Sequence, residues 1–290
     1  MSLRLKFNLS LLVVMVLGLA VSGYFLRDLL QKNAREEVFH EAGLLMESAL
    51  AIRAYTVDHV RPRLQKQLEE EFLPQTVPAF AATETFATLK KKYPEYAYKE
   101  ATLNPTNPRN RAEDWEAKIV QAFRADADAK ETNGVRNTQF GPSLYMARPI
   151  KITNSACLAC HSEPSAAPAS MIRTYGSERG FGWQLNEIIG AQVVSVPTDV
   201  PIQRAQAAYR TFMVSLTAVF LFIGIALNIM LLIMVIRPVT KLSRLADQVS
   251  LGQMDVPDFQ SGAKDEIGVL AESFNRMKKS LVQAMKMLED

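Results

Sequence analysis

Two long runs without a charged side chain constrain this sequence more than any other feature. They cover residues 7–26 and 211–236 and consist mainly of Leu, Val, Ile, Phe and Met. Each run reaches the roughly 20 residues that a helix needs to cross ~30 Å of hydrocarbon. Neither run carries the polar stripe that is typical of a helix in a soluble core. We therefore expect two transmembrane helices, at 7–26 and 211–236.

A cleaved signal peptide is the alternative for the first run. Arg4 and Lys6 would form its basic start, and the small residues of 19–22 would offer a cleavage site. However, the run is longer than the roughly 7–15 residues of a signal core, and a helix-compatible sequence continues through residues 27–32. We therefore expect the first helix to be retained.

Basic residues predict the orientation in the membrane. Arg4 and Lys6 precede the first run, and Arg237, Lys241 and Arg244 follow the second. Since basic residues favour the cytoplasm, both ends are expected there. Residues 27–210 would then form one periplasmic domain of a multi-pass protein in a bacterial inner membrane. The net charge of +3 over 290 residues gives no reason to expect a nucleic-acid partner.

The two cysteines occur together, as Cys157-Leu158-Ala159-Cys160-His161. This is the pattern of c-type haem attachment, in which each thiol adds to a vinyl group and His161 binds iron. A zinc site would need four ligands, and the other histidines, His40 and His59, have no ligand spacing. A redox pair would leave the histidine unexplained, and a disulfide would close a loop too short to stabilise much. One covalent haem c is therefore expected.

The sixth position on the iron is less constrained by the sequence. Met46, His40 and His59 lie on the long helical stretch after the first span, and a vacant position is also compatible. Leu45, Met46 and Ala49 make an apolar face that could cover a haem, which favours Met46. A methionine on such a face is more commonly core packing.

The outer domain mixes helical and strand patterns. We expect helices at 27–60, 84–92 and 113–123, with a bend or stop before Pro62. Strands are expected at 96–103, 144–152 and 188–196, and turns at 104–108 and at Asn133-Gly134. This combination predicts an α+β domain of PAS-like character.

Several motifs then resemble a known family in the same order along the chain. They are Ile52-Arg53-Ala54-Tyr55-Thr56, Pro62, Pro105-Thr106-Asn107-Pro108-Arg109-Asn110, Arg148-Pro149-Ile150, the Cys157–His161 motif, Ala167-Pro168, Tyr175-Gly176, Gly180-Phe181-Gly182-Trp183 and residues 190–197. Together they resemble the Tll-type, PAS-like c-haem domain over about residues 34–197. The resemblance implies one c-type haem, a redox- or gas-sensing role, and a helix with Met46 and Arg53 over the distal side.

Two residues of that helix have open roles. Arg53 either pairs with a surface carboxylate or neutralises a haem propionate, which a fixed guanidinium does well. Tyr55 either fills the core or lies near the haem.

Residues 237–290 are expected to form a cytoplasmic coiled coil. Leu242, Leu245 and Val249 follow Pro238 at heptad spacing, and Gly252 is placed to end that helix. A second helix is expected from Asp265, with apolar residues alternating in steps of three and four: Ile267, Leu270, Phe274, Met277 and Leu281. Asp265-Glu266-Ile267-Gly268 and Phe274-Asn275-Arg276-Met277 resemble the HAMP domain, which implies a four-helix bundle in a homodimer that transmits motion of a membrane helix.

These expectations favour a membrane-bound haem c sensor subunit for redox state, O₂, NO or CO. No nucleophile–base set or phosphate loop is visible, so we do not expect an enzyme. No kinase, cyclase or chemoreceptor segment follows the seam, so the output is expected from a separate cytoplasmic kinase or chemoreceptor-type protein. The alternative functions are a membrane-anchored cytochrome c electron carrier and a non-signalling assembly anchor.

Overall fold

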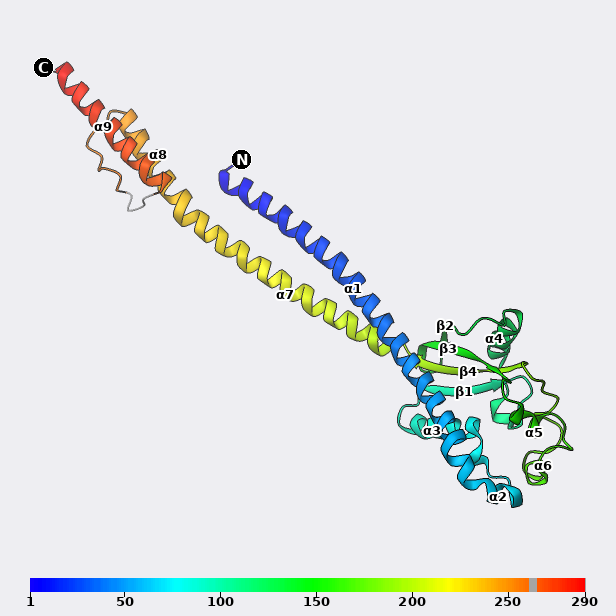
Figure 1. Cartoon of the computed structure of the whole chain (residues 1–290). Coiled ribbons are helices and arrows are strands. Elements are labelled where there is room, and N and C mark those ends of the chain that lie inside the picture. The colour runs from blue at the N-terminus through cyan, green and yellow to red at the C-terminus, as the bar shows by residue number, and fades with distance from the viewer. Residues whose placement is uncertain (261–264, 290) are drawn as a thin grey trace. The chain divides into compact units, whose positions relative to one another are not determined.

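The computed structural model describes residues 1–260 and 265–289, and the chain divides into two compact units (Figure 1). One unit is Leu26–Tyr209, and the other combines Met1–Phe25 with Arg210–Asp290. Helix α1 (Leu3–Tyr55) and helix α7 (Asp199–Leu231) each contribute residues to both units.

The unit Leu26–Tyr209 is built on a four-stranded antiparallel sheet. Its strands are β1 (Ala97–Thr102), β2 (Thr132–Thr138), β3 (Gly141–Lys151) and β4 (Ile188–Pro197), in the order β1-β4-β3-β2. Strand β4 is buried at every position because it is central and helices cover both faces. This explains why its sequence is almost continuously apolar rather than alternating.

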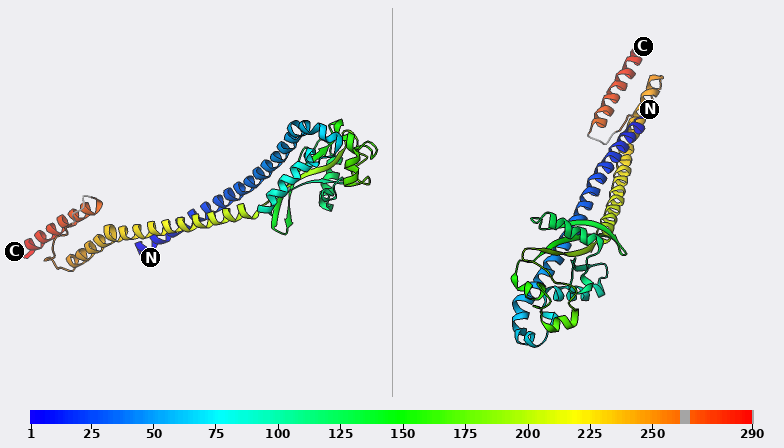
Figure 2. Two further views of the ribbon diagram at one scale, coloured as in Figure 1. Left: turned by 90° about the horizontal axis from the view of Figure 1, so that it is seen from below. Right: turned by 90° about the vertical axis from the view of Figure 1, so that its right-hand side faces the viewer.

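Two hydrophobic clusters fill the two faces of the sheet. One joins α1 and α3 (Pro78–Lys92) to side chains that include Tyr98, Val194 and Val196. The other joins α4 (Asp114–Ala125) to side chains that include Ala101, Ala191 and Val193 (Figure 1, Figure 2). Successive residues of one strand therefore serve opposite clusters, as the period of two requires.

The remaining helical segments of this unit are short. Helix α1 passes into a π-helical turn (Thr56–Val60), a 3-10 turn (Arg61–Leu64) and α2 (Gln65–Glu70). Further 3-10 turns cover Pro74–Thr76, Pro108–Asn110 and Ser155–Cys157. Helices α5 (Leu158–His161) and α6 (Ala169–Tyr175) lie between β3 and β4 in the sequence.

Most expected elements of this unit are confirmed, including the α+β class. The helix expected at 84–92 begins earlier, at Pro78, which occupies the first turn where its missing N–H is tolerated. Pro62 does not stop the chain's helical path; it lies at the start of the 3-10 turn that follows the π-helical turn.

The turn expected at Asn133-Gly134 is wrong, because both residues lie inside β2. A Cβ on Gly134 would lie 2.6 Å from the Tyr145 hydroxyl, so the glycine makes room for an aromatic ring across the strand pair. The turn between β2 and β3 lies further along and uses Gly141, whose φ is +98°.

In the other unit, the apolar parts of α1 and α7 contact each other through small residues. A Cβ on Gly18 would lie 3.4 Å from the ring of Phe220, and a Cβ on Gly224 would lie 3.7 Å from the Met15 sulfur. Close approach of this kind is typical of helix pairs in membranes. Both helices lie in helical stretches that are long and apolar enough to cross a membrane.

A π-helical turn (Leu232–Ile236) links α7 to α8 (Arg237–Ser250), and α9 spans Glu266–Glu289. A third hydrophobic cluster joins Leu242, Leu245 and Val249 of α8 to Ala271 and Phe274 of α9. The helix end expected at Gly252 is confirmed, since α8 ends at Ser250 and Gly252 has a φ of +86°. Residues 261–264 and 290 of the expected cytoplasmic segment lie outside the described residues.

Candidate functional site

The Cys157–His161 motif forms a short helical hook directly after β3. The Asn154 side chain accepts a 2.9 Å hydrogen bond from the Ala156 N–H and so begins the 3-10 turn that carries Cys157. Helix α5 then carries Cys160 and His161. The Cys157 side chain is exposed and Cys160 is half-buried, and both thiols are free. The two sulfurs are therefore accessible for covalent attachment.

His161 is oriented by a backbone carbonyl. Its Nδ1 lies 2.7 Å from the carbonyl oxygen of Gly180. A carbonyl only accepts, so the partner assigns the proton to Nδ1 and leaves the lone pair of Nε2 free for a metal. Burial lowers the pKa of His161, and the hydrogen bond to Gly180 opposes that change. Burial thus favours the neutral imidazole, which is the form that binds iron.

The loop before β4 also holds His161 from its ring face. The Trp183 indole stacks on the imidazole with ring centroids 4.0 Å apart and an interplanar angle of 14°. The backbone N–H of Trp183 donates to the His161 carbonyl at 3.2 Å, and the backbone N–H of Gly182 donates to the Ser162 carbonyl at 2.9 Å. The imidazole is therefore fixed by one edge and one face before any metal binds.

Gly180 lies where a larger residue does not fit. Its φ is +81°, and a Cβ there would lie 2.8 Å from the Thr106 backbone. The loop that contains Gly180 thus packs closely against the turn that follows β1, which brings residues 104–106 beside the Cys157–His161 motif. The Thr106 hydroxyl oxygen lies 3.5 Å from His161 Nδ1.

Two arginines near the end of α1 act electrostatically on the cysteines: Arg53 on α1 itself and Arg61 in the 3-10 turn Arg61–Leu64. Burial raises the pKa of the Cys160 thiol, and the positive charge of Arg61 opposes the rise. For Arg53, burial lowers the pKa, but Glu100, Tyr98 and Cys157 together outweigh it, so the pKa is raised. The structure therefore brings the arginine-bearing end of α1 within electrostatic range of the motif.

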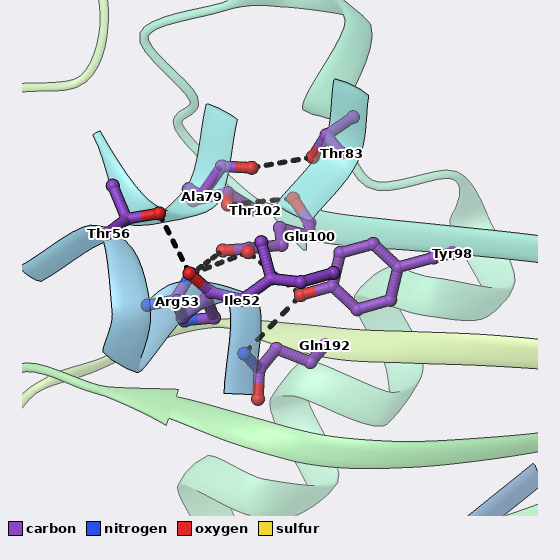
Figure 3. Close-up of polar contacts among 9 residues, drawn as sticks. All are labelled: Ile52, Arg53, Thr56, Ala79, Thr83, Tyr98, Glu100, Thr102 and Gln192. Atoms are coloured by element: carbon purple, nitrogen blue, oxygen red, sulfur yellow. Dashed lines mark hydrogen bonds and ion pairs between the residues drawn. The ribbon is translucent and has the colours of Figure 1, made fainter. Parts of the chain in front are cut away.

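Arg53 pairs with a buried carboxylate rather than a surface one. Its Nη1 lies 2.5 and 2.6 Å from the two oxygens of Glu100, whose side chain is 5% exposed (Figure 3). The Tyr98 hydroxyl donates to the same carboxylate at 2.8 Å, and the Gln192 amide donates to that hydroxyl at 3.4 Å. Arg53 thereby joins α1 to β1 and β4.

Tyr55 does not fill the core, since its side chain is 62% exposed. Its ring lies against His59, with centroids 5.3 Å apart. His59 lies in the π-helical turn, a feature that is often found at functional sites. His40 is also exposed and lies earlier on α1.

The structure does not bring Met46 to the motif. Its side chain is completely buried in the cluster between α1, α3 and the sheet, where it packs with residues such as Phe86, Tyr98 and Val194. None of the members of that cluster comes from residues 157–183. Core packing accounts for Met46, and its expected contact with the haem is not supported.

Several residues of the site lie outside the set expected from sequence: Asn104, Gly180, Trp183, Arg61 and Glu100. One signal was visible for Glu100, which follows Tyr98 at strand spacing and so shares its buried face. Gly180 and Trp183 stood in a motif of the resemblance, but no role was expected for them, and Asn104 makes contacts that span up to 77 residues of sequence. Short-range spacing carries no information about such contacts.

The donor set fits a c-type haem. Two accessible thiols are spaced by two residues, and the histidine next to the second presents a free Nε2. Arg53 and Arg61 add positive charge that acts on Cys157 and Cys160, respectively. The site therefore has the chemical groups that covalent attachment and iron binding require.

Comparison with known proteins gives two family matches. The family model described as Tll0287-like matches residues 31–197, which is more than half of the chain. The HAMP domain model matches residues 230–283. Both resemblances expected from the sequence are confirmed.

Individual relatives were also found. The "Heme sensor protein HssS" of Staphylococcus aureus strains JH9 and Newman is 40% identical over 79 residues, 27% of this chain. This chain covers 17% of the length of those relatives. The solved structure titled "Crystal structure of the cyanobacterial heme-protein Tll0287" is 17% identical with a TM-score of 0.44, and the match covers 56% of this chain and 95% of that one.

Proposed function

Because the chain belongs to the Tll0287-like family and carries a HAMP domain, we propose that it is a membrane-bound sensor subunit with one covalently attached haem c. The observation that carries the proposal is the hook at Cys157–His161, with two accessible thiols and a histidine oriented through Nδ1. The name of the HssS relatives also supports a haem-related signalling role.

The chain's own residues would hold the haem as follows. Cys157 and Cys160 would form the two thioether bonds, and His161 Nε2 would bind the iron. The bound group supplies an iron that changes oxidation state or takes a small ligand such as O₂, NO or CO. Trp183 and the Gly180 carbonyl keep the imidazole in one orientation.

Arg53 is proposed to face a propionate while it stays paired with Glu100. Its Nη1 makes both short contacts with the carboxylate, which leaves the remaining guanidinium donors for a second anion. Tyr55 presents its exposed ring from the same end of α1, so we place it in the haem vicinity.

The signal is proposed to leave the domain through the helices that enter the membrane. α1 is one continuous helix from Leu3 to Tyr55, so a change at Arg53 acts on the same helix that contains the first span. The basic residues outside the two spans support a cytoplasmic location for both ends and a periplasmic haem domain.

The HAMP segment is proposed to act in a homodimer. Leu270, Met277 and Leu281 of α9 are 47%, 53% and 42% exposed in one chain, although they belong to the heptad seam. A second copy would bury them in a four-helix bundle. Two packings of that bundle, biased by the haem state, would pass the signal to a separate cytoplasmic kinase or chemoreceptor-type protein.

Cysteine cross-linking of the full chain tests this proposal. Leu242→Cys and Ile267→Cys place reporters on the two seam helices, and cross-linking is compared with the haem oxidised and reduced. We expect the pattern to change with the haem state and to stop changing when Cys157 and Cys160 are both replaced by Ala. Identical patterns in both haem states, together with rapid electron exchange with a soluble cytochrome, would instead support an electron carrier.

A further inference from the structure

We infer that Asn104 is a positioning residue for His161, because it fixes the backbone carbonyl that orients the imidazole. The inference rests on the proposed role of His161 as iron ligand. Asn104 lies just after β1, 57 positions before His161 in the sequence, and its side chain bonds to Gly180 and Phe181. It acts through the loop that precedes β4.

The Asn104 side chain forms hydrogen bonds with this loop through both its amide oxygen and its amide nitrogen. Its Oδ1 accepts a hydrogen bond from the Gly180 N–H at 3.1 Å, and its Nδ2 donates to the Phe181 carbonyl at 3.2 Å. The two bonds flank the Gly180 carbonyl, which itself accepts from His161 Nδ1 at 2.7 Å. Because one rigid amide holds the groups on either side, that carbonyl has little freedom to turn away from the imidazole.

A second contact restrains the same carbonyl independently. Gly180 lies so close to Thr106 that a Cβ would lie 2.8 Å from the Thr106 backbone, and its φ is +81°. Gly182 has a similar φ of +80°, but a Cβ there would meet nothing within 4 Å. The close approach is therefore particular to Gly180 and does not follow from loop geometry alone.

The hydrogen bond at Nδ1 determines how strongly Nε2 donates to iron. A carbonyl acceptor makes the imidazole more basic, and partners of this kind are as important to a metal site as the ligands they orient. A more basic ligand stabilises oxidised iron relative to reduced iron. Loosening the Gly180 carbonyl should therefore raise the midpoint potential of the haem.

The first test compares Asn104→Ala with Asn107→Ala in the full chain, loaded with haem. Asn107 lies three positions after Asn104 in the same turn cluster, and its side chain accepts a local 3.1 Å bond from the Arg109 N–H. We expect Asn104→Ala to shift the oxidised-to-reduced ratio at fixed potential about tenfold, which is ~59 mV for one electron. Asn107→Ala should shift it less than about twofold.

The second test moves the carbonyl without touching Asn104. Gly180→Ala should raise the potential in the same direction as Asn104→Ala, whereas Gly176→Ala, at a similar φ of +80° with nothing within 4 Å of a Cβ, should not. Because both substitutions act on one carbonyl, their effects should not add in the double variant. Wild-type potentials in Asn104→Ala and Gly180→Ala would overturn the inference, as would equal shifts in the two control variants.

A haem-free measurement separates this inference from the proposed function. In the full chain with Cys157 and Cys160 replaced by Ala, the ¹⁵N spectrum of labelled His161 reports whether Nδ1 carries a hydrogen-bonded proton. We expect that signature to be lost in Asn104→Ala and kept in Asn107→Ala. An unchanged spectrum in Asn104→Ala refutes the positioning role, whereas a wild-type chain that never binds haem refutes only the proposed function.

Discussion

Replacement of Arg53 by Met should destabilise the domain Leu26–Tyr209 in a way that depends strongly on pH. The substitution keeps much of the side-chain volume but leaves Glu100, with 5% side-chain exposure, without its cation. Among the described residues, Tyr98 would remain as the other side chain that donates to the carboxylate. Removing one partner of a buried pair typically costs ~3–5 kcal/mol.

The size of the effect is limited by protonation. An unpaired buried carboxylate avoids the desolvation cost by binding a proton. Protonating an ordinary glutamate with a pKa of about 4.3 costs ~3.7 kcal/mol at pH 7 and ~1 kcal/mol at pH 5, because each pH unit above the pKa adds about 1.36 kcal/mol. In the variant the folded carboxyl binds its proton more tightly than the unfolded one, so the loss of stability is smallest at acidic pH and grows as the pH rises. We expect a loss of ~3–4 kcal/mol at pH 7 and ~1 kcal/mol at pH 5.

Urea unfolding of the full chain measures this loss. The two tryptophans of the chain, Trp115 and Trp183, both lie within Leu26–Tyr209 and report its unfolding by fluorescence. Arg109→Met is the matched control, because Arg109 pairs with Glu84 at the same 2.5 Å but with 37% and 47% side-chain exposure. It should cost about 1 kcal/mol or less at either pH. A pH-independent loss in Arg53→Met, or an equal loss in the control, would refute the reasoning.

Three further predictions concern the sheet, the cytoplasmic segment and alkaline pH. Gly190→Ala should cost ~1–3 kcal/mol in the same urea assay, because a Cβ there would overlap the backbone of β1. Asn275→Ala removes both 3.0 Å hydrogen bonds to the Phe259 backbone and should speed proteolytic cleavage of residues 251–260, while the haem spectrum stays unchanged. Burial and the Glu100 carboxylate raise the pKa of Tyr98. The contribution of the Tyr98 hydroxyl to stability is therefore complete below about pH 10 and declines as the pH rises further. Tyr98→Phe should remove this decline in thermal melts at about pH 9 to 11.

The elements of this chain that follow a local period could be predicted from its sequence. Strand β4 and helix α4 match their expected ranges because apolar periodicity reflects burial directly. The turn at Asn133-Gly134 failed because the same dipeptide serves a different purpose inside β2, where Gly134 accommodates Tyr145. That purpose depends on a cross-strand neighbour, which local turn preferences do not describe.

For the site, the sequence indicated the Cys157–His161 motif but not its surroundings. The spacing of Cys157, Cys160 and His161 is the pattern of c-type haem attachment, and it is visible in one short segment. An apolar helix face looks the same whether it covers a cofactor or a sheet, so the sequence could not distinguish these roles for Met46, which packs in the core. Asn104 reaches its partner across 76 positions of sequence, so only the folded chain shows that it belongs to the site.

Covalent haem attachment is tested most directly by the mass and the visible spectrum of the intact chain, purified after export together with the Cys157→Ala, Cys160→Ala double variant. The account predicts that the wild-type chain carries the added mass of one haem after denaturation and shows a Soret band, and that the double variant has no covalent haem. A wild-type chain with the mass of the bare polypeptide and no Soret band would contradict the account.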